Sequence, residues 1–278
     1  MNRIGCHLST SKGLQKTIEQ CLKINADTFQ FFPRNPRGSK SRLIPRKEIE
    51  DFLELRNIYN INDIVCHGAY TMNLCSDRED LRKLAIRLIN EDMKKIQDMN
   101  IDKYVLHPGN HKKQGIEKGL DMIIHGLNQI DVSNGQQICI ETMSGKGTEL
   151  GSDLKEIAFI VNNAKIPLYV CIDTCHLFSS GVKLDTFDEY LDEFDKLLGI
   201  DKIKVIHCND SMMPFEGNKD RHEKFGKGLI GESDLLDVIF SERLKGRPII
   251  LETPNDLKGY KMEINDIRGK FNELQKNK

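Results

Sequence analysis

The sequence predicts an α/β fold, a single (β/α)8 TIM barrel that spans residues 1–278 as one domain. Short apolar runs alternate eight times with longer segments of helical periodicity. No Pro/Gly/Ser-rich linker and no change of composition separates these units. Repeated strand–helix units form parallel barrels of roughly 250 residues, so one domain accounts for the whole chain. An open, doubly wound sheet is the alternative arrangement.

The predicted strands are near-continuous apolar runs, which are typical of strands buried on both faces of a parallel sheet. They cover residues 4–8, 28–32, 64–67, 104–107, 137–141, 168–173, 204–207 and 248–252. The clearest helix is predicted over 77–99, because its apolar residues recur at spacings of three and four behind a Ser76-x-x-Glu79 capping box. A second capping box, Thr186-x-x-Glu189, predicts the start of another helix.

The composition is that of a soluble globular protein with a sizeable core. Hydrophobic residues make up 38% of the chain and charged residues 30%. No apolar run is long enough to span a membrane, and the N-terminus lacks the apolar core of a signal peptide. We therefore expect no membrane contact and a cytoplasmic location. The 8 cysteines are scattered along the chain, and we expect them to be reduced thiols, several of them in the core.

One segment of the chain has a strong local charge. The formal net charge of −1 gives no overall attraction to nucleic acid, so any contact with DNA requires a local basic surface. Such a surface is predicted between Arg34 and Lys47, where six cationic residues occur without an acidic one. Taken alone, this run is interpreted as a solvated basic loop.

The residues that close the predicted strands indicate a metal site. Six strands end in a side chain that can bind a metal ion: His67, His107, Glu141, Asp173, His207 and Glu252. In a barrel, the carboxyl ends of all strands face the same mouth, so these side chains converge at the C-terminal face. Unpaired carboxylates there would lose hydration without compensation, which argues against a packing role. Oxygen and imidazole ligands suit Zn²⁺ or Mn²⁺, and a carboxylate such as Glu141 can bridge two ions.

Two further groups raise the number of predicted ligands. His176 follows Asp173 by three residues, and these two side chains need not face the same ion. In Asp220-Arg221-His222 the ligand types lie two apart, which places both on one side of an extended segment. His176, Asp220 and His222 can thus complete a third site.

Other histidines and aromatic residues have simpler interpretations. We expect His7 to be a hydrogen-bonded core histidine and His125 to lie on the surface. Phe29, Phe31 and Phe32 are expected in the core rather than on an exposed surface for stacking bases.

Seven short motifs occur along the chain at or near the predicted strand ends. They are Gly5-Cys6-His7-Leu8-Ser9, Asn35-Pro36-Arg37, His107-Pro108-Gly109, Asp173-Thr174-Cys175-His176, His207-x-Asn209-Asp210-Ser211, Asp220-Arg221-His222-Glu223 and Leu251-Glu252-Thr253-Pro254. In this order they resemble the endonuclease IV family of apurinic/apyrimidinic (AP) endonucleases over the full length of the chain. The resemblance implies the same eight-stranded barrel. Relatives often carry a tryptophan after the Asn-Pro-Arg motif, and this chain has none.

The resemblance implies a ligand set for each of three metal ions. The first set is His67, His107 and Glu141, the second is Glu141, Asp173, His207 and Glu252, and the third is His176, Asp220 and His222. The metals of the family are usually zinc, sometimes with manganese. We therefore expect three Zn²⁺ per chain, with Mn²⁺ as an alternative occupant of one or more sites.

The resemblance also implies an activity, that of a deoxyribonuclease IV. Such an enzyme hydrolyses the phosphodiester 5′ to an abasic site in double-stranded DNA and leaves a 3′-hydroxyl and a 5′-deoxyribose phosphate. Glu141 would be its catalytic residue, because it organises the hydroxide that bridges two ions and attacks the phosphate. Arg37 and Tyr70 would lie on loops that enter the DNA at the lesion, where the missing base lowers the cost of extruding the nucleotide. We expect the protein to act as a monomer.

Two other functions fit parts of the pattern. A metal-dependent sugar isomerase or epimerase on the same barrel would also place Glu, Asp and His ligands at strand ends. It would not need the third ligand set or the arginine-rich loop after the second strand. A catalytically silent binder of DNA lesions would keep Arg37 and Tyr70 but would tolerate the loss of ligands.

Overall fold

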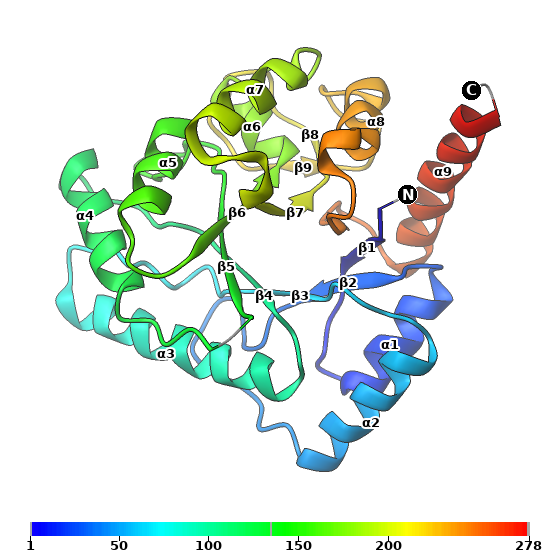
Figure 1. The fold of residues 1–278 in the computed structure, drawn as a ribbon, viewed down its shortest axis with the longest axis horizontal. Coiled ribbons are helices and arrows are strands. Elements are labelled where there is room, and N and C mark those ends of the chain that lie inside the picture. The colour runs from blue at the N-terminus through cyan, green and yellow to red at the C-terminus, as the bar shows by residue number, and fades with distance from the viewer. Residues whose placement is uncertain (1, 134, 277–278) are drawn as a thin grey trace.

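A closed barrel of parallel strands forms the centre of the structure, a computed structural model that describes residues 2–133 and 135–276 (Figure 1). Within these residues the barrel contains β1 (Ile4–His7), β2 (Thr28–Phe31), β3 (Val65–His67), β4 (Lys103–Leu106), β5 (Gln137–Glu141), β6 (Leu168–Asp173), β7 (Ile203–His207) and β10 (Ile249–Leu251). Neighbours follow chain order, and β10 closes the barrel by pairing in parallel with β1. The predicted (β/α)8 fold is therefore confirmed, and the open sheet is excluded. The predicted single domain covers residues 1–278. Residues 1, 134 and 277–278 of it lie outside the described part of the chain.

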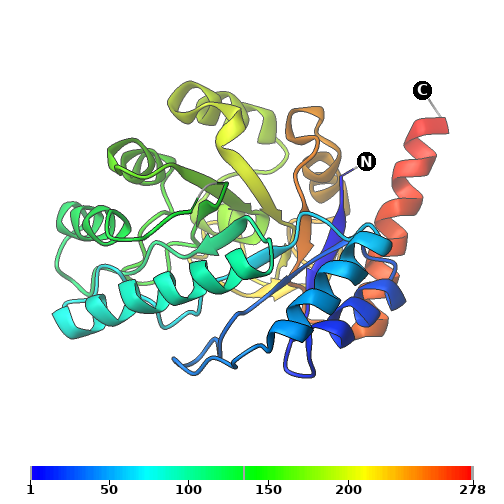
Figure 2. The ribbon, with the colours of Figure 1, turned by 60° about the horizontal axis from the view of Figure 1, so that its bottom comes forward.

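Helices surround the barrel on its outside (Figures 1 and 2). They are α1 (Leu14–Lys23), α2 (Arg46–Ile58), α3 (Glu79–Asp98), α4 (Ile116–Leu127), α5 (Leu154–Asn163), α6 (Thr174–Ser180), α7 (Phe187–Leu198), α8 (Glu232–Phe240) and α9 (Leu257–Lys276). Two short 3-10 helices, η1 (Ile200–Lys202) and η2 (Glu242–Leu244), precede β7 and β10. The apolar face of each amphipathic helix packs toward the barrel, as burial of nonpolar surface requires.

Two hydrophobic layers explain why the strands are apolar on both faces. Inside the barrel, a small cluster joins Val65, Val105, Cys139, Cys171, Val205 and Ile250, one from each of six strands. Outside it, strand residues such as Phe29 and Phe31 are fully buried against the helices. The eight cysteines lie in the described part of the chain and are all buried, free thiols. Among the described residues, no helix is both long and apolar enough to cross a membrane.

The two predicted capping boxes do not form. Helix α3 begins at Glu79 with Arg78 as its N-cap, two residues later than predicted, and no side chain caps it. The Ser76 hydroxyl instead accepts a hydrogen bond from the Arg78 backbone N–H at 3.3 Å, which makes a local turn before the helix. Thr186 does occupy the N-cap of α7, but its side chain makes no capping hydrogen bond.

A two-stranded antiparallel hairpin stands beside the mouth of the barrel. It consists of β8 (Asp210–Ser211) and β9 (His222–Glu223), with Ser211 opposite His222. The fully buried Asp210 carboxylate accepts hydrogen bonds from the backbone N–H groups of Ser211, Gly228 and Ile230 at 2.8–2.9 Å. These bonds fix the segment that presents His222 to the mouth.

Candidate metal centre

The predicted strand-end residues all lie at the carboxyl end of the barrel. His67, Glu141, Asp173 and His207 are the last residues of β3, β5, β6 and β7, while His107 and Glu252 directly follow β4 and β10. His176 comes from the first turn of α6, whose N-cap Asp173 accepts a hydrogen bond from the His176 backbone N–H at 2.8 Å. His222 belongs to β9, and Asp220 precedes that strand. The fold thus brings the nine predicted side chains to one place.

The Glu141 carboxylate lies at the centre of this group. Its Oε2 atom is 3.1 Å from Nε2 of His67 and 3.1 Å from Nε2 of His107. Its Oε1 atom is 3.1 Å from Nδ1 of His207. The carboxylate is 1% exposed, so water does not screen it. Because its two oxygens face different histidines, Glu141 has the geometry of a carboxylate that serves two cations.

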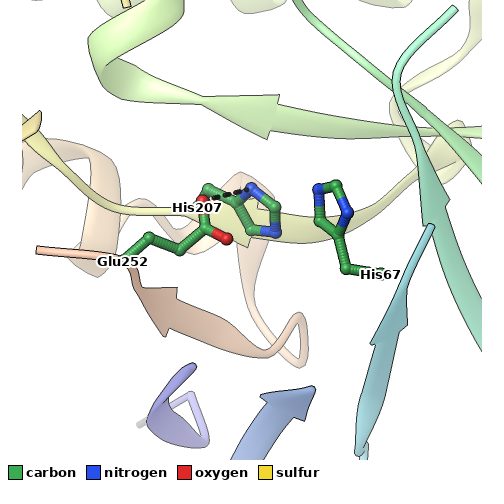
Figure 3. Close-up of side chains that lie close together, drawn as sticks. All are labelled: His67, His207 and Glu252. Atoms are coloured by element: carbon green, nitrogen blue, oxygen red, sulfur yellow. Dashed lines mark ion pairs between the residues drawn. The ribbon is translucent and has the colours of Figure 1, made fainter. Parts of the chain in front are cut away.

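A second set of ligand atoms adjoins the other side of Glu141. Nδ1 of His207 lies 3.3 Å from Oε2 of Glu252 and 3.8 Å from Oδ2 of Asp173. Figure 3 shows the Glu252 carboxylate against the His207 ring, with the His67 ring on the other side of His207. The ligand atoms of Glu141, Asp173, His207 and Glu252 lie within 4.8 Å of one another.

The third set is more open to solvent and lies beside the hairpin. Oδ1 of Asp220 is 3.2 Å from Nε2 of His222 and 3.5 Å from Nε2 of His176. Both Nε2 atoms are buried and have no hydrogen-bond partner among the described residues. Buried polar atoms are almost always paired, so two unpaired imidazole nitrogens beside one carboxylate fit a bound cation.

Backbone carbonyls fix the tautomers of three histidines. The Nδ1 atoms of His67, His176 and His222 lie 2.7, 2.8 and 3.2 Å from the carbonyl oxygens of Gly68, Thr142 and Glu252. A carbonyl can only accept, so each Nδ1 carries a proton and Nε2 is the nitrogen left to bind a cation. These Nε2 atoms face the cluster, which is the arrangement that histidine ligands of metal ions require.

The carboxylates and imidazoles of the cluster strongly shift one another's pKa values. Burial opposes ionisation of Glu141, but the facing His207 and His107 outweigh it and lower the pKa of the Glu141 carboxyl well below its usual value. Burial likewise opposes protonation of His176, but Asp173 and Asp220 raise the pKa of its imidazole well above the ordinary value. The protein without metal ions therefore holds imidazolium–carboxylate pairs in these positions, and a bound cation would replace the protons.

Two buried polar residues that were not predicted as site residues, Gln30 and Asn209, hydrogen-bond to the predicted ligands. The Gln30 side chain is fully buried and hydrogen-bonds to both His207 and Glu252. Asn209 donates to Oδ2 of Asp173 at 2.7 Å and accepts from the Glu252 backbone N–H at 2.8 Å. Gln30 could have been found from the sequence, because it is a polar residue within an otherwise apolar strand. Asn209 stands inside the His207-x-Asn209-Asp210-Ser211 motif.

His7 and Phe32 contribute to the wall of the site rather than to the core. His7 is hydrogen-bonded, as expected, but its partner is Gln30 and its Nδ1 lies 3.7 Å from Oε1 of Glu252. The Phe32 ring is only partly buried and contacts the rings of His7 and His67 at centroid distances of 4.3 and 5.3 Å. The core placement predicted for Phe29 and Phe31 is confirmed, and that for Phe32 is wrong.

Tyr70 and Arg37 lie on adjoining loops at the edge of the cluster. The Tyr70 ring is 56% exposed and lies 5.8 and 5.5 Å from the rings of His67 and His107. The Tyr70 backbone N–H donates to the Pro36 carbonyl at 3.1 Å, which ties its loop to the one that carries the exposed Arg37. Both side chains are exposed to solvent.

The basic loop is less solvated than the sequence indicates. Arg34 is 4% exposed, and its guanidinium makes an ion pair with the fully buried Asp92 of α3 at 2.8 Å. Arg42 is paired with Glu48 through two hydrogen bonds of 2.6 and 2.7 Å. The interpretation as a solvated loop is therefore wrong for Arg34, which anchors the loop instead of extending from it.

Comparisons with known proteins agree with this geometry. The family model described as "Xylose isomerase-like TIM barrel" matches residues 18–269. A curated protein of Finegoldia magna named "Probable endonuclease 4" is 81% identical over 100% of both chains. The crystal structure of endonuclease IV from Thermus thermophilus has a TM-score of 0.88 at 29% identity and covers 98% of this chain and 99% of its own. A D-psicose 3-epimerase of Clostridium cellulolyticum shares the fold alone, with a TM-score of 0.69 at 13% identity over 96% of this chain and 97% of its own.

Proposed function

Since the chain belongs to the endonuclease IV family, we propose that it is a metal-dependent DNA-repair endonuclease that hydrolyses the phosphodiester 5′ to an abasic site in double-stranded DNA. The products of this reaction are a 3′-hydroxyl and a 5′-deoxyribose phosphate. The observation that carries the proposal is the division of the Glu141 oxygens between two groups of histidines, beside a third set of ligand atoms.

Three divalent ions, principally Zn²⁺ with Mn²⁺ as an alternative, complete the proposed site. The ligand sets are His67, His107 and Glu141, then Glu141, Asp173, His207 and Glu252, then His176, Asp220 and His222. The unpaired Nε2 atoms of His176 and His222 support the third set. The absence of thiolates from these sets suits a site that polarises water and phosphate oxygens rather than a closed structural zinc site.

The side chains of the cluster have distinct tasks in the proposed reaction. When bound, the ions lower the pKa of a water molecule and neutralise charge that develops on the phosphoryl oxygens. Glu141 is the proposed catalytic residue, because its two oxygens face different histidines and would hold the first two ions next to each other. Asp220 and His222, on the open side of the cluster, are assigned to the side of the departing 3′ oxygen.

Recognition of the lesion is assigned to the two loops at the rim. Tyr70 stands beside His67 and His107, so a group inserted into the DNA there lies next to the reacting phosphate. Arg37 supplies a cation on the adjoining loop, which Arg34 anchors to α3. An abasic nucleotide has no base to unstack, so extruding it costs less than extruding an intact nucleotide.

The sugar epimerase alternative shares the barrel but does not account for the whole mouth. It gives no role to the set of His176, Asp220 and His222 or to the loop that carries Arg37. A lesion binder without catalysis is also disfavoured, because all nine ligand-type side chains are kept within one cluster.

Cleavage assays separate these functions. The purified protein is incubated with a duplex that contains one abasic site, with the matched intact duplex, and with a ketohexose. The proposal expects a single cut 5′ to the lesion, its loss after treatment with a chelator, and its recovery when Zn²⁺ is returned. Interconversion of the ketohexose without DNA cleavage would support the epimerase, and binding of the abasic duplex without a cut would support the silent binder.

A further inference from the structure

Gln30 is a fully buried polar residue in the middle of β2, between the core residues Phe29 and Phe31. A side chain with an amide is an unusual choice for this position, because burial of an unpaired amide costs stability. Gln30 avoids that cost through contacts with two proposed metal ligands. Its side chain reaches His207 across the barrel mouth at 2.8 Å and Glu252 at 2.7 Å.

The hydrogen-bonding capacity of each partner determines the orientation of the Gln30 amide. The Glu252 carboxylate only accepts hydrogen bonds, so the atom 2.7 Å from its Oε1 must be the donor Nε2. The Gln30 oxygen therefore faces Nε2 of His207, and an amide oxygen only accepts, so His207 carries its proton on Nε2. The second N–H of Gln30 points to Nδ1 of His7 at 3.1 Å. Every hydrogen-bonding atom of the amide is thereby used.

This orientation determines what His207 and Glu252 present to the cluster. With Nε2–H held by Gln30, Nδ1 is the His207 nitrogen that faces the cluster, 3.1 Å from Oε1 of Glu141 and 3.3 Å from Oε2 of Glu252. Glu252 has Oε1 held by Gln30, which leaves Oε2 as the oxygen that faces His207. His207 thus offers Nδ1, whereas His67, His176 and His222 offer Nε2 and are held by backbone carbonyls.

We propose that Gln30 is a positioning residue, which selects Nδ1 of His207 as a metal ligand and aims one oxygen of Glu252 at the same centre. The inference rests on the proposed function, because it gives Gln30 a role toward the second ligand set. One amide thus orients His207, as backbone carbonyl oxygens orient His67, His176 and His222. A role limited to packing would be served equally well by an apolar residue of the same length.

Two substitutions separate the acceptor from the donor. Gln30→Met keeps the length of the side chain and removes both functions. Gln30→Glu keeps an acceptor for His207 but loses the N–H groups and sets a second carboxylate beside Glu252. Phe29→Leu is the matched control, since Phe29 is the neighbouring, fully buried residue of the same strand and belongs to the outer hydrophobic layer.

Two readouts apply to the full-length, zinc-loaded protein with ¹⁵N-labelled histidine. The first is the imidazole spectrum, in which wild type should show the His207 proton on Nε2. The second is zinc retention in competition with a chelator. Gln30→Met should lose the His207 Nε2–H signal and weaken retention of one of the three ions by about 10–100-fold. Gln30→Glu should keep that signal and still weaken retention, and Phe29→Leu should lower thermal stability while both readouts stay as in wild type.

The outcomes are distinct. An unchanged His207 spectrum and unchanged zinc retention in Gln30→Met would overturn the proposal, as would equal losses in Phe29→Leu. Failure of the proposed function would be seen separately, as wild-type protein that binds no zinc, and the His207 spectrum would then still decide the Gln30 contact. If Gln30→Met does not fold, loss of zinc from folded Gln30→Glu supports the proposal and its full retention contradicts it.

Discussion

Nε2 of His222 lies 3.2 Å from Oδ1 of Asp220. This nitrogen is buried, and within the described part of the chain it makes no hydrogen bond of acceptable geometry. The hairpin of β8 and β9 holds it there, because the Asp210 carboxylate ties the hairpin to the loop that follows. Nδ1 of His222 is turned away toward the Glu252 carbonyl at 3.2 Å. The lone pair of His222 therefore points at a position that a cation can fill.

Substitution His222→Ala should remove one metal ion and leave two. In the proposed assignment His222 belongs to the third ligand set only, whereas Glu141 is shared between the other two sets. Elemental analysis of protein purified without chelator should therefore fall from about three zinc ions per chain to about two. The control is His125→Ala, which removes an exposed histidine of α4. Equal loss from all three sites, or full retention, would contradict this assignment.

Tyr70→Ala should weaken binding to a duplex with an abasic site by at least about tenfold, because the exposed ring stands beside the cluster. Metal content should not change. Tyr59→Ala is the matched control, since Tyr59 is 50% exposed on the outside of the barrel after α2. Binding of an intact duplex, measured by fluorescence anisotropy, should change much less. Equal effects of both substitutions would reject the role of Tyr70.

Arg37→Ala should also weaken binding and should reduce its dependence on salt, because one phosphate contact is lost. Arg87→Ala, which removes an exposed cation of α3, serves as the control. The measurement is the affinity for abasic duplex as a function of salt concentration. The same slope and affinity in wild type and Arg37→Ala would show that Arg37 does not contact the DNA.

The buried Arg34–Asp92 pair should be important for stability and for the loop that carries Arg37. Asp92→Ala leaves the buried guanidinium with the half-exposed Glu91 as its remaining anionic partner and should cost about 3–5 kcal/mol in the free energy of unfolding. Glu91→Ala removes the half-exposed partner of the same arginine and should cost less than about 1 kcal/mol. Unfolding in urea measures both values. Similar values for the two variants would show that burial of the pair is not decisive.

Several parts of the site could be predicted because ligand and strand are adjacent in sequence. His67, Glu141 and His207 directly follow or end apolar runs, so the strand pattern alone placed them at one mouth. Arg34 could not be placed in the same way, because its partner Asp92 lies in α3 and is brought near only by the packing of that helix on the loop. The start of α3 was misjudged because Ser76 makes a turn of its own instead of a cap.

The role of Gln30 depends on register, which the sequence pattern does not reveal. Gln30 pairs with His7 across β1 and β2, and this register puts it on the inner face at the height of Glu252. Its neighbours in the chain, Phe29 and Phe31, face the helices instead. A period of two along the strand predicts the alternation but not the partner across the mouth.

Zinc binding should release protons at pH 7. The carboxylate of Glu141 outweighs burial and raises the pKa of His107, and Asp173 does the same for His176, so folding without metal favours the protonated form of both imidazoles. Metal ions bind the neutral form, so affinity should fall as the pH falls. Titration calorimetry in two buffers of different ionisation enthalpy measures the release. An enthalpy that does not depend on the buffer would contradict it.

The same shifts set the pH dependence of stability in the metal-free protein. Histidines whose pKa is raised by folding stabilise the native state fully below about 6.5, the unfolded value, and this contribution is lost as the pH rises through the folded values. Metal-free protein should therefore be easier to unfold at pH 9 than at pH 6. Urea unfolding at the two pH values measures this difference, and bound zinc should reduce or reverse it, because zinc affinity falls as the pH falls.

The most direct test of the account is the single-turnover rate at which Glu141→Gln cleaves a duplex with one abasic site. This substitution keeps the size of the side chain and removes the charge that both histidine groups face. The rate should fall about a thousandfold or more, because water activation and stabilisation of phosphoryl charge contribute several kcal/mol in such sites. DNA binding should persist, and Glu117→Gln, an exposed glutamate of α4, should cleave like wild type. A Glu141→Gln rate within about tenfold of wild type would contradict the account.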